Sequence, residues 1–312
     1  MFRWRPFRRS GGRPVILDIV NGQRFVRVAP YRAPKMAGLL RLARPINCVM
    51  SALGVGIGGV VAARSGAWGA FAGPLALAGA AAASFTAGGN ALNDLYDRET
   101  DRVNHPNRPL PSGAVTLREA QAFTATAFFI AGVLAAVVNV FAFTVVILNI
   151  ALMVLYEASL KAQGASGNLV IAYLVGSLFL FAGVSVFRSS TEPLVRTSIL
   201  AALALFTTVG REITKDIQDV RGDVDRRTLP QRIGVRPAGW AAALAFLLGV
   251  LLSLAPLALH LLSVAYAVLV LPADGMFIYA ALHSAKNPAR SQRVAKYGMI
   301  VALAAFLAGA LA

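Results

Sequence analysis

The sequence has few of the residues on which disulfide-linked and zinc-binding proteins depend. Its 312 residues include one cysteine, Cys48, and three histidines that are far apart, His105, His260 and His283. A single cysteine cannot form an internal disulfide, and scattered histidines do not have the spacing of zinc ligands. We therefore expect neither a disulfide-stabilised fold nor a zinc site.

Charged residues are also scarce, and acidic residues are the scarcest. Only 14% of the residues are charged and 57% are hydrophobic, with 14 acidic against 30 basic side chains and a formal net charge of +16. Soluble domains are usually about 25% charged. This composition excludes an ordinary soluble domain and a disordered chain. The glycines have no three-residue period, which excludes collagen.

The excess of positive charge does not indicate nucleic-acid binding, because the basic residues separate long apolar segments. A helix of about 20 apolar residues spans a bilayer. Such segments lie at residues 39–63, 67–92, 117–137, 140–160, 168–187, 195–215, 237–255, 257–281 and 293–312. The sequence therefore predicts an all-α polytopic membrane protein with nine transmembrane helices.

Residues 1–36 differ from the rest of the chain, because they are strongly basic and precede the first long apolar segment. We expect them to form a cytoplasmic tail along an anionic membrane leaflet, where each basic side chain contributes about 1 kcal/mol. Residues 37–312 then form the transmembrane domain. No cleaved signal peptide is expected, since no apolar run follows the N-terminus directly.

The basic residues also predict the orientation. If the nine segments all cross the membrane, 27 of the 30 Lys and Arg residues lie on one side, and only Arg64, Arg188 and Arg196 lie on the other. The positive-inside rule places the richer side in the cytoplasm. We therefore expect a cytoplasmic N-terminus, an external C-terminus and two cytoplasmic loops, 94–116 and 216–237, that are longer than the external ones.

Most of the nine aspartates lie in two short stretches, each of which extends the cytoplasmic end of a membrane helix. Asn93, Asp97 and Asp101 are four residues apart, as are Asp219 and Asp223, so each set lies along one helix face. Repeated acids at a helix C-terminus are destabilising unless something neutralises them. One explanation is pairing with nearby arginines. The other is Mg²⁺, which binds carboxylates together with substrate phosphates.

Basic residues on the same side of the membrane suit a diphosphate, whose charge they share with the metal ions. The candidates are Arg44, Arg108, Lys161, Lys215 and Arg226, although each taken alone is also typical of an interfacial anchor. A weak internal repeat supports two related halves around one site, because Arg108-Pro-Leu-Pro recurs as Arg227-Thr-Leu-Pro 119 residues later. The same offset separates Asp97 from Asp216.

These residues carry a resemblance to a known family. Asn93-x-x-x-Asp97-x-x-x-Asp101, followed by residues 104–113 (NHPNRPLPSG), resembles the first signature of the UbiA superfamily of intramembrane prenyltransferases. Asp219-x-x-x-Asp223 resembles the second. The resemblance implies nine helices around a central cavity, capped by cytoplasmic loops, with Mg²⁺ and a prenyl diphosphate between the two motifs.

Within the superfamily, residues 211–223 (REITKDIQDVRGD) and Arg44-Pro45-x-Asn47 are similar to the archaeal digeranylgeranylglyceryl phosphate synthases. Arg221 departs from that pattern, since the archaeal enzymes often have an acidic residue there. The resemblance implies transfer of a geranylgeranyl group from its diphosphate to the free hydroxyl of geranylgeranylglyceryl phosphate, a step in archaeal membrane lipid synthesis.

The resemblance also implies roles for individual residues. Asn93, Asp97, Asp101, Asp219 and Asp223 would hold Mg²⁺, with support from Asp94 and Asp216, and Arg108 and Lys161 would bind the diphosphate. Lys215 and Arg226 are further candidates for substrate binding, while Arg44 and Asn47 would bind the acceptor phosphate. The sequence does not show which group removes the acceptor proton, for which Tyr156 and the aspartates are candidates. The catalytic candidates are Asp97, Asp219, Lys161 and Tyr156.

Other functions are compatible with parts of the pattern. The same chemistry with an aromatic quinone precursor or a chlorophyllide as acceptor would use both motifs. A cation-coupled transporter would use buried acids, but transporter sites usually lie near the bilayer midplane and these acids lie at helix ends. A non-catalytic scaffold leaves both motifs unexplained. The sequence does not indicate the oligomeric state.

Overall fold

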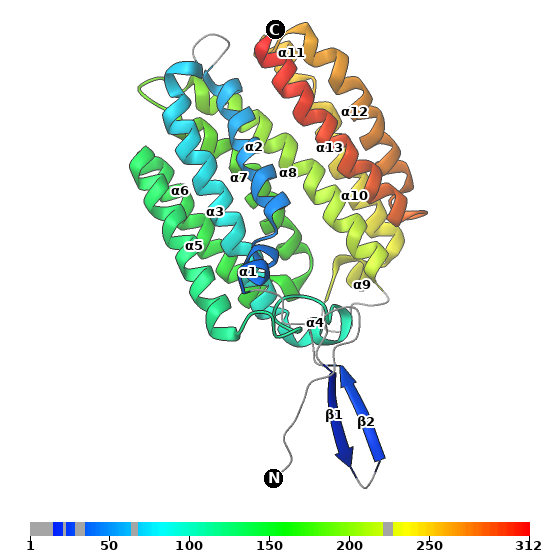
Figure 1. The fold of residues 1–312 in the computed structure, drawn as a ribbon. Helices are drawn as coiled ribbons and strands as arrows, with labels where there is room; N and C mark the ends of the chain where they lie inside the picture. The colour runs from blue at the N-terminus through cyan, green and yellow to red at the C-terminus, as the bar shows by residue number, and fades with distance from the viewer. Residues whose placement is uncertain (1–14, 21–22, 29–34, 64–67, 221–226) are drawn as a thin grey trace.

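The computed structural model describes residues 15–20, 23–28, 35–63, 68–220 and 227–312 (Figure 1). In this part of the chain, nine helices are long and apolar enough to cross a membrane. They are α2 (Pro45–Ala63), α3 (Ala72–Tyr96), α5 (Leu117–Val138), α6 (Val140–Ala158), α7 (Ala165–Ser185), α8 (Glu192–Asp219), α10 (Val235–Leu252), α12 (Val264–His283) and α13 (Pro288–Leu311). The predicted all-α, nine-helix membrane fold is confirmed.

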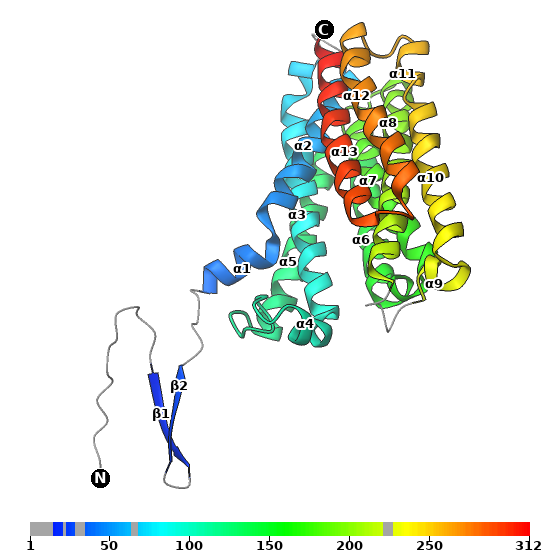
Figure 2. The same cartoon turned by 90° about the vertical axis from the view of Figure 1, so that its right-hand side faces the viewer.

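Short elements connect these helices. They are α1 (Lys35–Ala43), the 3₁₀ turns η1 (Trp68–Phe71) and η2 (Leu160–Gln163), α4 (Arg98–Asn104), α9 (Leu229–Ile233) and α11 (Ala255–Ala258). In the tail, β1 (Val15–Val20) and β2 (Gln23–Val28) pair as an antiparallel hairpin. The views in Figures 1 and 2 place α4 and α9 at one end of the bundle and the C-terminus at the opposite end. We call the end that carries α4 and α9 the polar end.

Several helix boundaries differ from the prediction. The first segment is two helices, because the chain breaks at Arg44, whose φ is 52°. Pro45 follows directly, and a proline disfavours helical geometry in the residue before it. α8 continues past 215 to Asp219, and α12 begins at Val264 instead of 257 because α11 and a loop precede it.

Small residues bring the helices together, as is usual in membranes, where apolar side chains gain little from leaving lipid. Gly176 of α7 faces α8 so closely that a Cβ there would lie 2.7 Å from the carbonyl oxygen of Ala201. A cluster of buried alanines, including Ala78, Ala82 and Ala131, joins α3 to α5. Large apolar side chains such as Trp240 remain exposed on the outside of the bundle, where lipid would cover them.

Two capping boxes fix the loops at the polar end. Thr116 and Glu119 form one at the start of α5. Thr228 and Gln231 form a second one at the start of α9, in the other copy of the internal repeat. Each box satisfies backbone N–H groups at a helix start, so each long loop ends at a defined position at the polar end of the bundle.

Candidate active site

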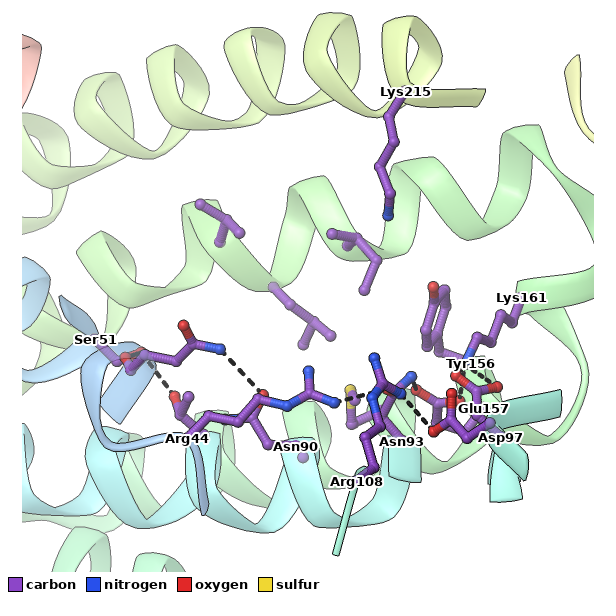
Figure 3. Close-up of a pocket in the computed structure, with 18 of the residues that line it drawn as sticks. Arg44, Ser51, Asn90, Asn93, Asp97, Arg108, Tyr156, Glu157, Lys161 and Lys215 are labelled. Atoms are coloured by element: carbon purple, nitrogen blue, oxygen red, sulfur yellow. Dashed lines mark hydrogen bonds and ion pairs between the residues drawn. The ribbon is translucent and has the colours of Figure 1, made fainter. Parts of the chain in front are cut away.

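A cavity of about 1070 Å³ opens among α2, α3, α6, α7 and α8 toward the polar end. Figure 3 shows that its labelled side chains come from opposite sides: Asn90, Asn93 and Asp97 from α3 and its end, and Lys215 from α8. The cavity is large enough for a sizeable ligand, because small-molecule sites usually measure about 300–1,000 Å³.

The first acidic stretch forms one wall of this cavity. α3 ends at Tyr96 and α4 begins at Arg98, with Asp97 at the junction. The four-residue backbone bonds nevertheless continue, since Asp97 N–H donates to the Asn93 carbonyl at 2.9 Å and Asp101 N–H to the Asp97 carbonyl at 2.8 Å. Asn93, Asp97 and Asp101 therefore line the same cavity, as their spacing predicts.

Lys161 lies at the centre of an ion-pair network. Its Nζ is 2.8 Å from both carboxylate oxygens of Asp97 and 2.8 Å from Glu157 Oε2. The other Glu157 oxygen accepts a bond of 2.9 Å from Asn93 Nδ2. The Glu157 side chain is fully buried and that of Lys161 is 11% exposed. Glu157 thus fixes a lysine and a candidate metal ligand at once (Figure 3).

Two arginines hold the other acids of this wall. Arg108 comes from the loop after α4, and its Nη1 pairs with Asp101 and lies 3.6 Å from Asp94. Arg44, at the break between α1 and α2, donates to Asp94 and to Asn93. Asp94 is buried at 2% exposure and does not line the cavity. It therefore orients both arginines from behind the wall.

The second acidic stretch faces the first across the cavity. Lys215, Gln218 and Asp219 line it from the last turns of α8. Lys215 points into the cavity, and its Nζ is 3.7 Å from Glu212 Oε2. Asp216 lies outside the lining and accepts a bond of 2.7 Å from Asn168 Nδ2 of α7. The two acidic stretches therefore meet at one site.

Away from the polar end, the cavity becomes apolar. Its lining there includes the side chains of Phe85, Met153, Ile171, Leu174 and Leu178. A hydroxyl pair, Ser51 Oγ and Thr86 Oγ1 at 2.7 Å, crosses from α2 to α3 beside this region. The site combines a charged mouth with an apolar interior, which suits a ligand with an anionic head and a hydrocarbon tail.

The oxygen donors at the mouth are of the type that Mg²⁺ prefers, because Asn93, Asp97, Asp101 and Asp219 all line one cavity. Among the described residues, however, no three acidic, histidine or cysteine side chains come together as a metal-binding group. The ion pairs explain this arrangement, since Lys161 holds Asp97 and Arg108 holds Asp101. The donor set fits Mg²⁺ if the cations release these carboxylates.

The structure brings most of the predicted site residues together. The cavity is lined by Arg44, Asn47, Asn93, Asp97, Asp101, Arg108, Tyr156, Lys161, Lys215 and Asp219. Asp94 and Asp216 lie behind this lining. Asp223 and Arg226 lie outside the described residues, so their predicted roles remain predictions.

Two acidic residues of interest were not among the predicted site residues. Glu157 had a readable signal, because a glutamate four residues before a lysine on a helix predicts an ion pair. Asp274, in the middle of α12, is 8% exposed and accepts a bond of 2.7 Å from Ser253 Oγ. Acids within the bilayer span are functional candidates by default. Asp274 does not line the cavity described above, and it lines a second one instead.

Known proteins of similar sequence cover most of this chain. The chain is 38% identical over 280 residues to the digeranylgeranylglyceryl phosphate synthase of Halobacterium salinarum. This alignment covers 88% of this chain and 97% of that relative. It is 40% identical over 282 residues to the enzyme of the same name from Methanopyrus kandleri, covering 88% of this chain and 100% of that one.

Solved structures show the same fold. A structure described as that of digeranylgeranylglyceryl phosphate synthase in membranes superposes with a TM-score of 0.75 at 31% identity, over 89% of this chain and 99% of that one. A UbiA homologue from Archaeoglobus fulgidus, bound to GPP and Mg²⁺, superposes with a TM-score of 0.56 at 18% identity. The superposition covers 85% of this chain and 99% of that one.

The family model extends over both halves of the site. It matches residues 51–308, which include the two acidic stretches and the loops that follow them. With the relatives above covering most of the chain, the family is established: this multi-pass membrane protein belongs to the UbiA prenyltransferase family.

Proposed function

We propose that this protein transfers a geranylgeranyl group from geranylgeranyl diphosphate to the free hydroxyl of geranylgeranylglyceryl phosphate. The observation that carries the proposal is the cavity itself, whose mouth joins two acidic stretches with Lys161, Arg108 and Lys215 and whose interior is apolar. Relatives at 38–40% identity that bear the name of this synthase support the choice of substrates.

Mg²⁺ would bind at the mouth through Asn93, Asp97 and Asp101 on one side and Asp219 and Asp223 on the other. Asp94 would support this set by orienting Arg44 and Arg108, and Asp216 by its bond to Asn168. When bound there, Mg²⁺ would neutralise the negative charge that grows on the departing diphosphate. The Archaeoglobus homologue that binds GPP and Mg²⁺ supports this assignment.

The cations of the mouth would exchange partners when the substrate enters. Lys161 and Arg108 are now held by Asp97 and Asp101. Both cations would donate to diphosphate oxygens, which would leave Asp97 and Asp101 available to Mg²⁺. Lys215 reaches the same space from α8, and Arg226 would contribute from the loop beyond it. Glu157 would keep Lys161 in place throughout, because Glu157 accepts from the lysine through Oε2 and is not itself a proposed metal ligand.

The reaction forms a bond between the acceptor hydroxyl oxygen and the allylic carbon, and breaks the bond between that carbon and a diphosphate oxygen. The hydroxyl proton would pass through Tyr156 or an aspartate of the mouth to the released diphosphate. Positive charge develops on the allylic carbon, and an apolar interior protects it from water. Tyr156 lines the cavity beside Lys161, where its ring would stabilise that charge.

The acceptor would approach from the side of α2. Arg44 and Asn47 line the cavity there, and we propose that they lie beside the glycerol end of the acceptor. We also propose that the polar end faces the cytoplasm, since 27 of the 30 Lys and Arg residues lie on that side by the sequence count. The N-terminus and both long loops would then be cytoplasmic and the C-terminus external.

A transfer assay tests this function. Detergent-solubilised protein is mixed with radiolabelled geranylgeranyl diphosphate and geranylgeranylglyceryl phosphate, with Mg²⁺ or with excess EDTA. The proposal predicts a lipid-soluble, phosphate-bearing product that forms only with Mg²⁺. Transfer to an aromatic acceptor or a chlorophyllide alone would reject the proposed acceptor. Absence of transfer and of diphosphate release with every acceptor would favour the transporter alternative.

A further inference from the structure

A second cavity of about 410 Å³ lies beside the first, among α2, α7, α8, α10, α12 and α13. None of the proposed metal or diphosphate ligands that the structure describes lines it. Its walls carry aromatic and aliphatic side chains from several helices, among them Leu203, Val270, Phe277, Leu303 and Phe306. A space of this size and character suits a small lipid chain.

The two cavities share part of their walls. Asn47 and Ser51 of α2 and Val175 and Leu178 of α7 line both. Ligands in the two cavities would therefore meet at these four residues. Asn47 and Ser51 are the polar members of this group, so a hydroxyl of one ligand can be placed there and directed toward the other.

Two basic residues line the second cavity and not the first, Arg211 of α8 and Lys296 of α13. At the polar end, α8 ends at Asp219 and α13 begins at Pro288. Arg211 and Lys296 each lie eight residues from that terminus of their helix. At 1.5 Å per residue, both positions are about 12 Å inside those ends. The two residues therefore lie at a similar distance from the polar ends of their helices.

These basic residues have unused capacity to bind an anion. Arg211 Nη1 donates to Glu212 Oε1 at 2.6 Å, but Arg211 Nε is buried without a hydrogen-bond partner. Within the described residues, Lys296 forms no ion pair. A buried donor left without a partner is costly, so Arg211 favours a ligand that supplies acceptor oxygens. Lys296 is exposed, and its ammonium group is available to the same ligand.

The deeper polar groups of the second cavity bond to each other. Ser253 Oγ donates to Asp274, and the hydroxyl of Tyr266 donates to the Ser253 carbonyl at 2.8 Å. Tyr266 is fully buried and stacks on Phe306. These contacts need no polar ligand, so the interior beyond the two basic residues accepts hydrocarbon.

We propose that the second cavity binds the acceptor, with its phosphate on Arg211 and Lys296 and its isoprenoid chain in the apolar interior. The acceptor's free hydroxyl would lie at Asn47 and Ser51, facing the donor in the first cavity. Phosphate, hydroxyl and chain leave three adjacent glycerol carbons in different directions, which matches the three features of this site. The inference rests on the proposed function, because it takes its acceptor from it.

Steady-state kinetics with two acceptors test the phosphate contacts. Lys296→Ala should raise the KM for geranylgeranylglyceryl phosphate about tenfold or more, since the loss of a hydrogen bond between two charged groups weakens binding by about that factor. Lys296→Arg should recover most of the loss. With geranylgeranylglycerol, which lacks the phosphate, wild type and variant should have the same KM. Arg293→Ala is the control, because Arg293 is exposed on the same helix and lines neither cavity.

A matched pair of cavity-filling variants tests the chain site. Ala302 lines only the second cavity and Ile171 only the first. Ala302→Phe should raise the acceptor KM about tenfold and leave the donor KM within about twofold, and Ile171→Phe should do the reverse. Each protein is first compared with wild type by thermal unfolding in detergent.

The results separate this inference from the proposed function. If wild type does not transfer to geranylgeranylglyceryl phosphate, the proposed function is wrong. If wild type transfers but Ala302→Phe raises the donor KM instead, the second cavity holds the donor chain and the inference is wrong. A Lys296→Ala penalty that persists with the phosphate-free acceptor would also overturn it, because the lysine would then act on something other than the phosphate.

Discussion

Replacing Glu157 by glutamine removes the one fully buried carboxylate that joins Lys161 to Asn93. The carboxylate accepts from Lys161 Nζ at 2.8 Å and from Asn93 Nδ2 at 2.9 Å. Glutamine keeps the shape and one acceptor oxygen but loses the charge, and its NH₂ group faces a donor. Because hydrogen bonds to charged groups contribute about 1.5–3 kcal/mol, we expect a loss of about 2 kcal/mol in stability.

The loss is not larger because Lys161 keeps its second partner. Asp97 still binds the ammonium group through both oxygens at 2.8 Å, so no buried charge is left alone. In the active complex, however, Asp97 is proposed to bind Mg²⁺, and Lys161 then depends on Glu157 for its position. A small misplacement of a positioning group costs about 10²-fold in rate.

Donor kinetics at saturating acceptor measure this effect, together with thermal unfolding in detergent. Glu157→Gln should lower kcat/KM for the donor about 10²-fold and lower the Tm by a few degrees. Glu99→Gln is the matched control, since Glu99 is 62% exposed and pairs with Arg102 at 2.7 Å on α4. Exposed pairs contribute little. If Glu157→Gln and Glu99→Gln behave alike, the positioning role of Glu157 is refuted.

Three further predictions follow from the same structure. Asp97→Ala and Asp219→Ala should each abolish transfer while leaving a folded protein, and wild-type turnover in either would reject the metal assignment. Gly176→Ala should destabilise the protein by about 1–3 kcal/mol in a denaturation series, because the new Cβ would lie 2.7 Å from the Ala201 carbonyl oxygen; an unchanged unfolding midpoint would contradict the close α7–α8 contact. Thr116→Ala should cost about 1 kcal/mol in the same series through loss of its capping box, and Thr116→Ser should retain most of the stability.

The sequence predicted the nine membrane helices well because a bilayer demands long uninterrupted apolar segments. It predicted their ends less well, because hydropathy falls before the helix stops. The last turn of α8 carries Lys215, Asp216 and Asp219, which are polar but helical. The break at Arg44 was also missed, although Pro45 is its readable cause.

The acidic stretches were found because their four-residue spacing is visible in the chain. The contact between Arg108 and Asp94 was not predictable in the same way, because it depends on the path of a loop. The second cavity had no sequence signal at all, since its lining comes from six helices and each contributes a few residues. Asp274 was overlooked because it is a single acid in an otherwise apolar segment.

The most direct test of the central claim is a competition between acceptors. Wild-type protein, Mg²⁺ and limiting radiolabelled geranylgeranyl diphosphate are incubated with equal concentrations of geranylgeranylglyceryl phosphate and an aromatic quinone precursor. The account predicts that the label goes to the glyceryl phosphate lipid and that EDTA prevents the transfer. Label that goes mainly to the aromatic acceptor would contradict it.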